Sequence, residues 1–223
     1  MKTAVVIPAF NAEKNIFDLV IKVSQYVSIN DIIVIDDGSS DNTFSIAEKL
    51  RINLLQHKSN SGKGKALYTG FQFAINKGYD AVIFIDSDFQ HQPEDIPRFI
   101  ELGRKNKFDV IIGTRKFEIG KMPFHRYLSN KTTSLVLSLT IGKRVSDSQS
   151  GYRMIKSKVL EKMDLVSHRY ETESEILIRA GKKRFNFGEL PIETIYKGDE
   201  VSHINPLLDT LRFIALVIKS WWW

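Results

Sequence analysis

The chain has 223 residues, of which 43% are hydrophobic and 26% charged, and its formal net charge is +6. These values are ordinary for a soluble globular protein and allow one sizeable core, so a single domain is expected. The absence of cysteine excludes a disulfide framework and thiolate metal sites, and it fits a reducing cytoplasm. The positive charge favours an anionic partner, such as nucleic acid, a phosphorylated ligand or an anionic membrane surface, although a solubilising surface charge explains it equally well.

The N-terminal segment lacks the pattern of a secretory signal, because its apolar run extends only from Ala4 to Ile7 before Pro8. No stretch of the sequence approaches the roughly 20 uncharged apolar residues of a membrane-spanning helix. We therefore expect neither a leader nor a spanning helix.

Strand and helix patterns alternate through the first half of the chain. Continuous apolar runs predict strands that are covered on both faces, and apolar residues at helical spacing predict the helices between them. The predicted strands are residues 3–9, 31–39, 52–58, 80–88 and 108–115, and the predicted helices are residues 13–27, 41–50 and 64–78, with a further helix opened by Pro93. This alternation predicts a mostly parallel sheet with helices on both faces.

The second half of the chain is less regular. Helices are predicted for residues 126–142, 157–163, 170–183 and 205–223, and a loop entering a strand is predicted for residues 147–155. Residues 185–196 are predicted to form paired strands separated at Pro191. No repeat, low-complexity tract or linker indicates a second independent domain.

Charged side chains follow three of the predicted strands. Asp36 and Asp37 end one, Asp86 and Asp88 end another, and Arg115 ends a third. The loops at the carboxyl ends of parallel strands form the ligand crevice of such a sheet. The clustering of these residues there is the first functional signal.

The segment "DSDFQ", residues 86–90, has three interpretations. Asp86 and Asp88 can simply cap a turn. They can also act as a phosphatase nucleophile and its acid/base partner, but that chemistry usually places the motif on the first strand with a threonine soon after. The third interpretation is metal–diphosphate binding, in which both carboxylates hold Mg²⁺ or Mn²⁺ and Gln90 adds a ligand or a hydrogen bond. His91 is expected at the surface or behind the ligands.

Two nucleotide-binding motifs are absent. The segment "SNSGKGKALYTG" fails the P-loop pattern because Lys65 is followed by Ala66, and no G-x-G-x-x-G follows the first strand. Asn60, Gly62 and Lys63 still form a flexible basic turn at a helix start, which suits a phosphate or a nucleotide edge. A plain helix-entry loop is the alternative.

Six segments together resemble family 2 glycosyltransferases, and most closely the polyprenyl- or dolichyl-phosphate sugar synthases. They are "VVIPAFNAEKNI", "IIVIDDGSSDNT", "NSGKGKALYTGF", "DSDFQHQPEDIP", "VIIGTR" and "DSQSGYRMI". The resemblance runs from Thr3 to about Arg212. It implies a GT-A fold, a divalent cofactor (Mg²⁺ or Mn²⁺) and an inverting hexose transfer from a nucleotide-diphosphate sugar, GDP-mannose or UDP-glucose, to a lipid-linked phosphate.

The resemblance also implies roles for single residues. Those that would line the nucleoside pocket are Pro8, Phe10, Glu13, Asp36 or Asp37, and Lys63. Those that would hold the metal against the diphosphate are Asp86, Asp88 and Gln90. Those that would receive an acceptor phosphate are Arg115 and Arg126. Asp88, Arg115 and Asp147 are the residues expected to carry the chemistry.

The role of Asp147 depends on the acceptor. An acceptor hydroxyl needs a general base, for which Asp147 is the candidate. An acceptor phosphate is already ionised near neutral pH, and Asp147 would then position only the sugar or Arg153. A turn-forming aspartate is the third possibility.

Later segments have further candidates. Glu171 and Glu173 resemble family residues that contact sugar hydroxyls. The alternative is that both are acidic residues on the exposed face of a helix, without a role in binding. Lys197 and His203 fall where relatives have a mobile basic loop over the donor, but "YKGDEVSHINP" departs from the usual Gly-Glu-Ser-Lys pattern.

The expected domains are a GT-A domain over residues 1–203 and an amphipathic helix over residues 204–223. Three tryptophans beside Lys219 suit a membrane interface, and packing on the sheet or an oligomer contact is the alternative. Residues 127–142 form a second apolar stretch. We therefore expect a peripheral protein on the cytoplasmic face of the membrane that binds no nucleic acid.

Other functions stay open at this stage. The same donor chemistry on a saccharide hydroxyl and a non-catalytic nucleotide-sugar-binding subunit both fit the motifs. A sugar-1-phosphate nucleotidyltransferase would need a glycine-rich N-terminal loop, which "IPAFNAEKN" is not.

Overall fold

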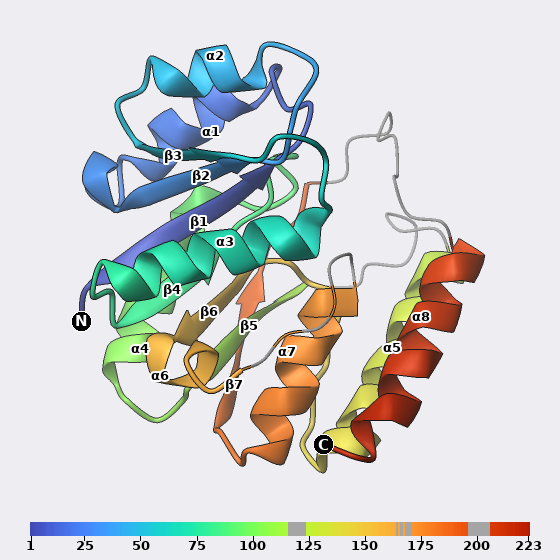
Figure 1. The fold of residues 1–223 in the computed structure, drawn as a ribbon. Helices are drawn as coiled ribbons and strands as arrows, with labels where there is room; N and C mark the ends of the chain where they lie inside the picture. Colours follow the sequence, from blue (N-terminus) through green and yellow to red (C-terminus); the bar gives the residue numbers. More distant parts are fainter. Residues whose placement is uncertain (116–123, 164, 166, 168–170, 196–205) are drawn as a thin grey trace.

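The computed structural model describes residues 1–115, 124–163, 165, 167, 171–195 and 206–223, and these form a seven-stranded sheet flanked by helices (Figure 1). The strands are β1 (Thr3–Ala9), β2 (Ile32–Asp36), β3 (Asn53–Gln56), β4 (Ala81–Phe84), β5 (Val110–Arg115), β6 (Arg153–Lys156) and β7 (Phe187–Ile192). The helices are α1 (Ile16–Val23), α2 (Thr43–Glu48), α3 (Lys63–Asn76), α4 (Ile96–Arg104), α5 (Phe124–Ile141), α6 (Ser157–Leu160), α7 (Glu171–Lys182) and α8 (Pro206–Ser220), with 3₁₀ turns η1 (Ile29–Asp31) and η2 (Pro93–Asp95).

The strand order is β3-β2-β1-β4-β6-β5-β7. Every pairing is parallel except those of β6, which runs antiparallel to both β4 and β5. Because β6 is reversed, its first residue, Arg153, pairs with Phe84 at the end of β4. The loop that leads into β6 therefore lies at the same edge of the sheet as the carboxyl ends of the parallel strands.

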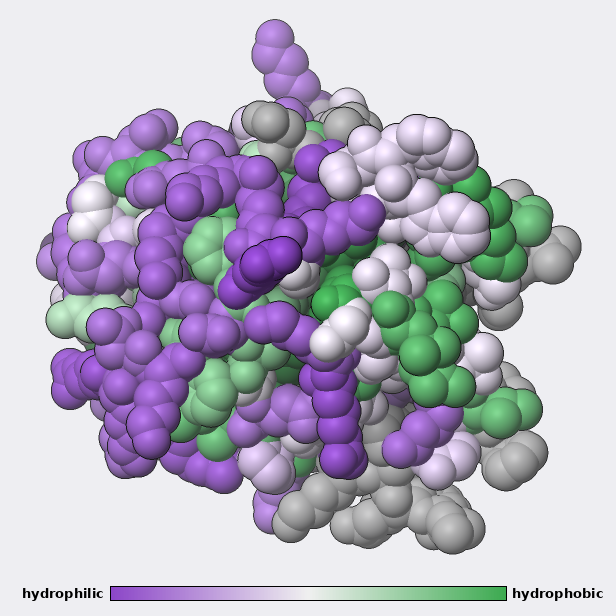
Figure 2. Space-filling view, turned by 90° about the horizontal axis from the view of Figure 1, so that it is seen from below, coloured by the Kyte–Doolittle hydropathy of each residue, from purple (hydrophilic) through white to green (hydrophobic). Residues whose placement is uncertain are grey.

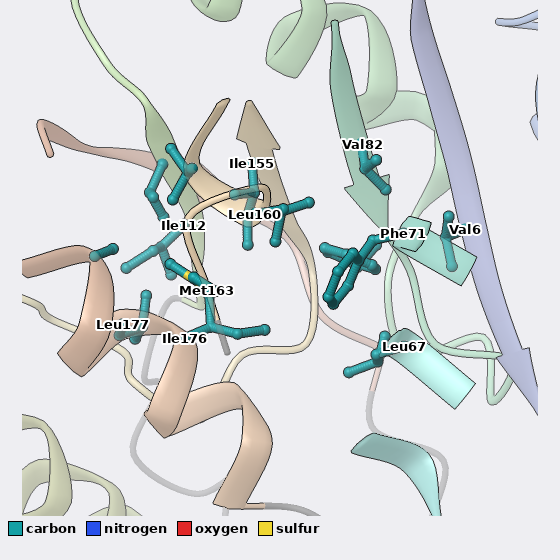
Figure 3. Packing of buried hydrophobic residues seen from close by; sticks show 14 of the residues in the cluster. Val6, Leu67, Phe71, Val82, Ile112, Ile155, Leu160, Met163, Ile176 and Leu177 are labelled. Carbon is teal, nitrogen blue, oxygen red and sulfur yellow. The ribbon is translucent and has the colours of Figure 1, made fainter. Parts of the chain in front are cut away.

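Both faces of the sheet are covered, which explains the continuous apolar runs in its strands. In β1, Val5 and Ile7 face a cluster built with α1, α2 and α4, whereas Ala4 and Val6 face a second cluster. The second cluster includes side chains of α3 and α5 to α8, and Phe71 of α3 lies near Val6 and Val82 of the sheet (Figure 3).

The predicted fold class is confirmed, and most predicted elements are present with shorter bounds. The predicted pair of strands at residues 185–196 is wrong, because Pro191 lies inside the single strand β7. Proline is tolerated there because β7 is an edge strand, and its missing N–H removes no bond to a further strand. In the described residues, no helix combines the length and apolar composition that crossing a membrane requires.

Candidate active site

Asp36 and Asp37 lie at the end of β2, and Asp37 forms hydrogen bonds with the turn before α3. The Asp37 carboxylate accepts hydrogen bonds from the backbone N–H groups of Ser61 (3.0 Å) and Gly62 (2.8 Å), and its Oδ1 lies 2.6 Å from Nδ1 of His57. Asp36 is fully buried and accepts hydrogen bonds from groups in its own loop and in β3. Both carboxylates therefore stabilise the loops of this edge, and their contact with a base or ribose stays a prediction.

The other residues predicted for the nucleoside pocket lie in or directly after β1. Pro8 is buried within β1, and Phe10 is half-buried beside it. The Glu13 carboxylate accepts hydrogen bonds from the backbone N–H (3.1 Å) and Nδ2 (2.9 Å) of Asn42. Glu13 thus joins the loop after β1 to the start of α2.

Lys63, the first residue of α3, lies between two carboxylates. Its Nζ is 2.7 Å from Oδ1 and 2.9 Å from Oδ2 of Asp86, and 2.8 Å from Oε1 of Glu173. The three side chains are only 21%, 22% and 12% exposed, respectively. Burial by itself lowers the pKa of Lys63, but the charges of Asp86 and Glu173 outweigh it and raise the pKa above its usual range. Lys63 is therefore a charged ammonium group at neutral pH.

The Asp86 carboxylate fits against a glycine. A Cβ atom on Gly151, in the loop that leads into β6, would lie 2.4 Å from Oδ2 of Asp86. Burial raises the pKa of Asp86, but the positive charges of Lys63 and Arg153 outweigh this effect and lower it. Asp86 is therefore an ionised carboxylate, and the bare backbone at Gly151 gives it room.

The residues after Asp86 form a tight turn. Phe89 has a φ of 63°, a left-handed conformation that is uncommon for a bulky residue, and Oδ1 of Asp88 accepts a hydrogen bond from the backbone N–H of Gln90 at 2.9 Å. Asp88 is exposed and Gln90 is half-buried. The turn leaves the Asp88 side chain exposed to solvent, two residues after Asp86.

This pair of carboxylates fits a hard divalent cation. Mg²⁺ is commonly held by one or two carboxylates, with phosphate oxygens and water completing its coordination. Asp86 and Asp88 supply that number of carboxylates, and the Asp86 carboxylate occupies the space that a side chain at position 151 would fill. Within the described residues no group of three or more His, Asp or Glu side chains converges to hold a metal by itself. The residues thus fit a cation that shares its ligands with a bound phosphate.

Arg115, at the end of β5, forms an ion pair with Asp147. Its Nε donates to Oδ2 of Asp147 (2.7 Å) and its Nη2 donates to Oδ1 (2.9 Å), while Nδ2 of Asn130 donates to Oδ1 as well (3.1 Å). Asp147 is fully buried. Burial alone raises the pKa of Asp147, but its bonds to Arg115 and Asn130 outweigh this effect and hold the pKa below its usual range. Asp147 is therefore an ionised partner that fixes the Arg115 guanidinium.

Arg153 is buried and directed toward the backbone. Its guanidinium donates to the carbonyl oxygens of Ser148 (2.6 Å), Ser150 (2.6 Å) and Glu173 (2.7 Å). These bonds join the loop before β6 to the start of α7. The observed contacts of Arg153 are structural, and its predicted contact with substrate stays a prediction.

His91 is buried near both ion pairs. It is only 3% exposed, so the surface is excluded and the expected position behind the ligands is the alternative left, and its ring is 5.4 Å from the ring of Tyr152. Burial is the main reason that its pKa falls to about 4. The negative charge of Asp86 opposes this shift, and the positive charge of Arg115 adds to it. His91 is therefore neutral at pH 7 and lies within electrostatic range of both pairs.

The structure also decides between the alternatives for α7. Glu173 is buried, so its interpretation as an exposed helix acid is wrong. Glu171 is half-buried. For both glutamates, contact with sugar hydroxyls stays a prediction. Lys197, His203 and the side chain of Arg126 lie outside the described part of the chain.

Sequence reasoning missed Gly151 and Asn130. Asn130, Ser134 and Ser138 recur every four residues along the helix, and this polar stripe was the available signal. Ser134 Oγ lies 3.1 Å from Ser148 Oγ, so the stripe faces the loop that carries Asp147. No comparable pattern distinguishes Gly151, because the requirement comes from a carboxylate far away in the sequence.

Three comparisons identify similar proteins. A family model described as glycosyl transferase family 2 matches residues 4–164. A UDP-N-acetylglucosamine–dolichyl-phosphate N-acetylglucosaminyltransferase of Methanococcus voltae is 34% identical over 213 residues, 86% of this chain and 84% of the relative. A polyprenol monophosphomannose synthase of Mycolicibacterium smegmatis is 30% identical over 203 residues, 86% of this chain and 76% of the relative.

The fold comparison agrees. The crystal structure of glucosyl-3-phosphoglycerate synthase from Mycobacterium tuberculosis in complex with Mg²⁺ and uridine diphosphate has a TM-score of 0.77 to this chain at 20% identity, and the match covers 98% of this chain and 79% of that one. At this identity the likeness establishes the shared fold alone.

We predict that Gly151→Ala displaces the Asp86 carboxylate, because the added Cβ would lie 2.4 Å from its Oδ2. The expected cost is about 1–3 kcal/mol of unfolding free energy, measured by urea denaturation. Gly103→Ala is the control, since its Cβ would meet the movable end of the Met154 side chain, and its cost should be smaller. Equal stability of wild type and Gly151→Ala would contradict this packing.

We also predict that Asp147→Asn lowers the unfolding free energy by about 3 kcal/mol at pH 7, because it breaks a buried ion pair. The pKa of Asp147 is lower in the folded protein than in the unfolded chain, where it is near 4. The ionised carboxylate therefore stabilises the fold fully above that unfolded value, and this stabilisation is lost as the pH falls through the folded-state pKa. In urea titrations, the difference between wild type and variant should therefore narrow below about pH 4. Asp18→Asn, at an exposed position of α1, is the control; a pH-independent difference would refute the argument.

Proposed function

The chain belongs to glycosyltransferase family 2, and we propose that it transfers a hexose, with inversion, from a nucleotide-diphosphate sugar to a polyprenyl phosphate. The observation that carries this proposal is the arrangement of two cationic residues along one edge of the sheet. Lys63 lies beside Asp86 at the end of β4, and Arg115 lies beside Asp147 at the end of β5. Two relatives that match most of the chain are named as transferases for dolichyl or polyprenol phosphate.

On the donor side, we assign the diphosphate to the corner formed by Lys63, Asp86 and Asp88. Asp86 and Asp88, with Gln90, would hold Mg²⁺ or Mn²⁺, which supplies charge stabilisation for the departing nucleoside diphosphate. Lys63 contributes a buried positive charge beside the same carboxylate. The loops that follow β1 and β2 would take the nucleoside, and GDP-mannose, UDP-glucose and the donor named for the Methanococcus relative are the candidates.

On the acceptor side, we assign the lipid phosphate to Arg115. A guanidinium offers several N–H groups in a fixed plane, which suits phosphate oxygens, and Asp147 fixes the orientation of that plane. A phosphate acceptor is ionised near neutral pH and requires no general base. We therefore propose that Asp147 positions Arg115, rather than removing a proton from the acceptor.

We further propose that α5 and α8 face the cytoplasmic surface of the membrane. In α8, Leu211, Ile214 and Ile218 are exposed along one face, and Trp221 and Trp222 follow with 72% and 77% exposure. Apolar side chains gather on the side of the molecule where α5 and α8 lie (Figure 2). Tryptophan beside a basic residue is typical of the headgroup region, which suits a helix lying in the interface.

The exposed face of α5 continues this apolar surface. Leu128, Leu135 and Leu139 are exposed, the last at 75%, while Leu137 on the other side of the helix is buried. Lys131 and Lys219 are exposed on α5 and α8 and suit anionic lipid headgroups. In this proposal, residues 1–203 form the catalytic domain and residues 204–223 its membrane-facing helix.

The proposed reaction is tested with purified protein, polyprenyl phosphate, Mg²⁺ or Mn²⁺, and a panel of radiolabelled nucleotide sugars. We expect label to partition into organic solvent for one donor. Asp88→Ala should abolish this transfer while the circular dichroism spectrum stays unchanged, because the variant removes one proposed cation ligand.

Asp18→Ala on α1 serves as the control and should retain activity. Label found only in water-soluble saccharide would favour a hydroxyl acceptor, and wild-type turnover by Asp88→Ala would contradict the assigned metal site. No turnover with any donor and acceptor would favour the non-catalytic binding subunit.

The membrane proposal is tested by sedimentation with vesicles that contain anionic lipid. The double substitution Trp221→Ser and Trp222→Ser should weaken binding by about tenfold or more, because two large interfacial side chains are lost. Phe17→Ser, which removes an exposed aromatic residue from α1 on the opposite side of the sheet, should bind like wild type. Equal binding of all three proteins would refute a role for α8.

A further inference from the structure

Lys63 forms ion pairs with two carboxylates of the proposed donor site, those of Asp86 and Glu173. Its ammonium group contacts both oxygens of Asp86, at 2.7 and 2.9 Å, and also Oε1 of Glu173 at 2.8 Å. Asp86 is the carboxylate that ends β4, whereas Glu173 lies in the first turn of α7. One cation thus neutralises two carboxylates from distant segments of the chain.

The other charged groups near Asp86 do not replace Lys63 in this role. His91 is neutral at pH 7, and the Arg153 guanidinium donates to three backbone carbonyls. Asp88 lies two residues further along and is itself acidic. In the described part of the site, Lys63 is therefore a cationic side chain in direct contact with the Asp86 carboxylate.

The backbone at Lys63 is fixed, but its side chain is a flexible stem. The Asp37 carboxylate holds the amides of Ser61 and Gly62 directly before it, and α3 begins at Lys63 itself. Any exchange of partners must therefore come from rotation of the four methylene groups of the side chain. Glu173 gives the ammonium group a second anchor when it leaves Asp86.

We propose that Lys63 is an internal counter-ion that occupies the Asp86 carboxylate in the ligand-free protein and competes there with a divalent cation. When Asp86 is taken by the cation, Lys63 stays bound to Glu173 and is directed toward the donor phosphates. This inference rests on the proposed function for the identity of the ligands, and it adds that cation binding without donor is weakened by the chain's own lysine.

The test measures binding of Mn²⁺ alone to the nucleotide-free protein, by electron paramagnetic resonance of free Mn²⁺. Lys63→Met removes the competing charge at nearly constant size and should bind Mn²⁺ about tenfold more tightly than wild type. Lys65→Met on the same helix is the control, because it changes the net charge equally while Lys65 lies over the ring of Tyr68. Equal or weaker Mn²⁺ binding by Lys63→Met would overturn the proposal.

Glu173→Gln supplies a second, independent test that leaves Lys63 in place. If Glu173 anchors Lys63, its neutralisation should weaken Mn²⁺ binding in the wild-type background by about threefold, and clearly less in the Lys63→Met background, where only the charge of Glu173 is lost. Weakening of similar size in both backgrounds would make Glu173 a metal ligand and would refute its role as anchor. Because no donor or acceptor is present, these outcomes are independent of whether the protein transfers sugar to a lipid.

Should Lys63→Met be unstable, its thermal midpoint with and without Mn²⁺ is the readout. Two adjacent carboxylates without their lysine repel each other, so Mn²⁺ should raise the midpoint of the variant more than that of wild type. An equal rise in both proteins would overturn the proposal as well.

Discussion

Charge compensation of buried carboxylates organises the active edge of this protein. An ionised carboxylate removed from water is costly unless hydrogen bonds or an opposite charge replace its hydration. Three aspartates at this edge meet this requirement differently: Asp37 through backbone amides, Asp86 through Lys63, and Asp147 through Arg115. Each solution fixes one neighbouring segment, so the same interactions that stabilise the edge also place the two cationic side chains of the proposed reaction.

The antiparallel strand β6 makes this arrangement possible. A parallel strand in its place would carry the loop before it to the opposite edge of the sheet. Instead, the loop over residues 146–152 lies between the ends of β4 and β5, where Gly151 meets Asp86 and Asp147 meets Arg115. Arg153 then secures the loop through three carbonyl oxygens. The proposed donor and acceptor sites are adjacent because one loop serves both.

The proposed reaction joins a water-soluble donor to a lipid-linked acceptor, and the fold separates these requirements in space. Polar loops at the strand ends hold the carboxylates, while α5 and α8 both pack on α7 and expose apolar side chains outward. Asn130 and Leu139 lie on the same helix, one bonded to Asp147 and the other exposed. Helix α5 thus links the apolar surface to the residue that fixes Arg115.

The sequence by itself determined the α/β class, most of the elements, the acidic segment after β4 and the family, because these depend on local periodicity and on short motifs. It did not determine that Glu173 shares Lys63 with Asp86, that Gly151 makes room for a carboxylate, or that Pro191 continues an edge strand. Those features depend on contacts between segments far apart in the chain and on the reversed direction of β6. Only the tertiary structure decided them, because burial creates the need for a partner and the topology of the sheet determines which partner is within reach.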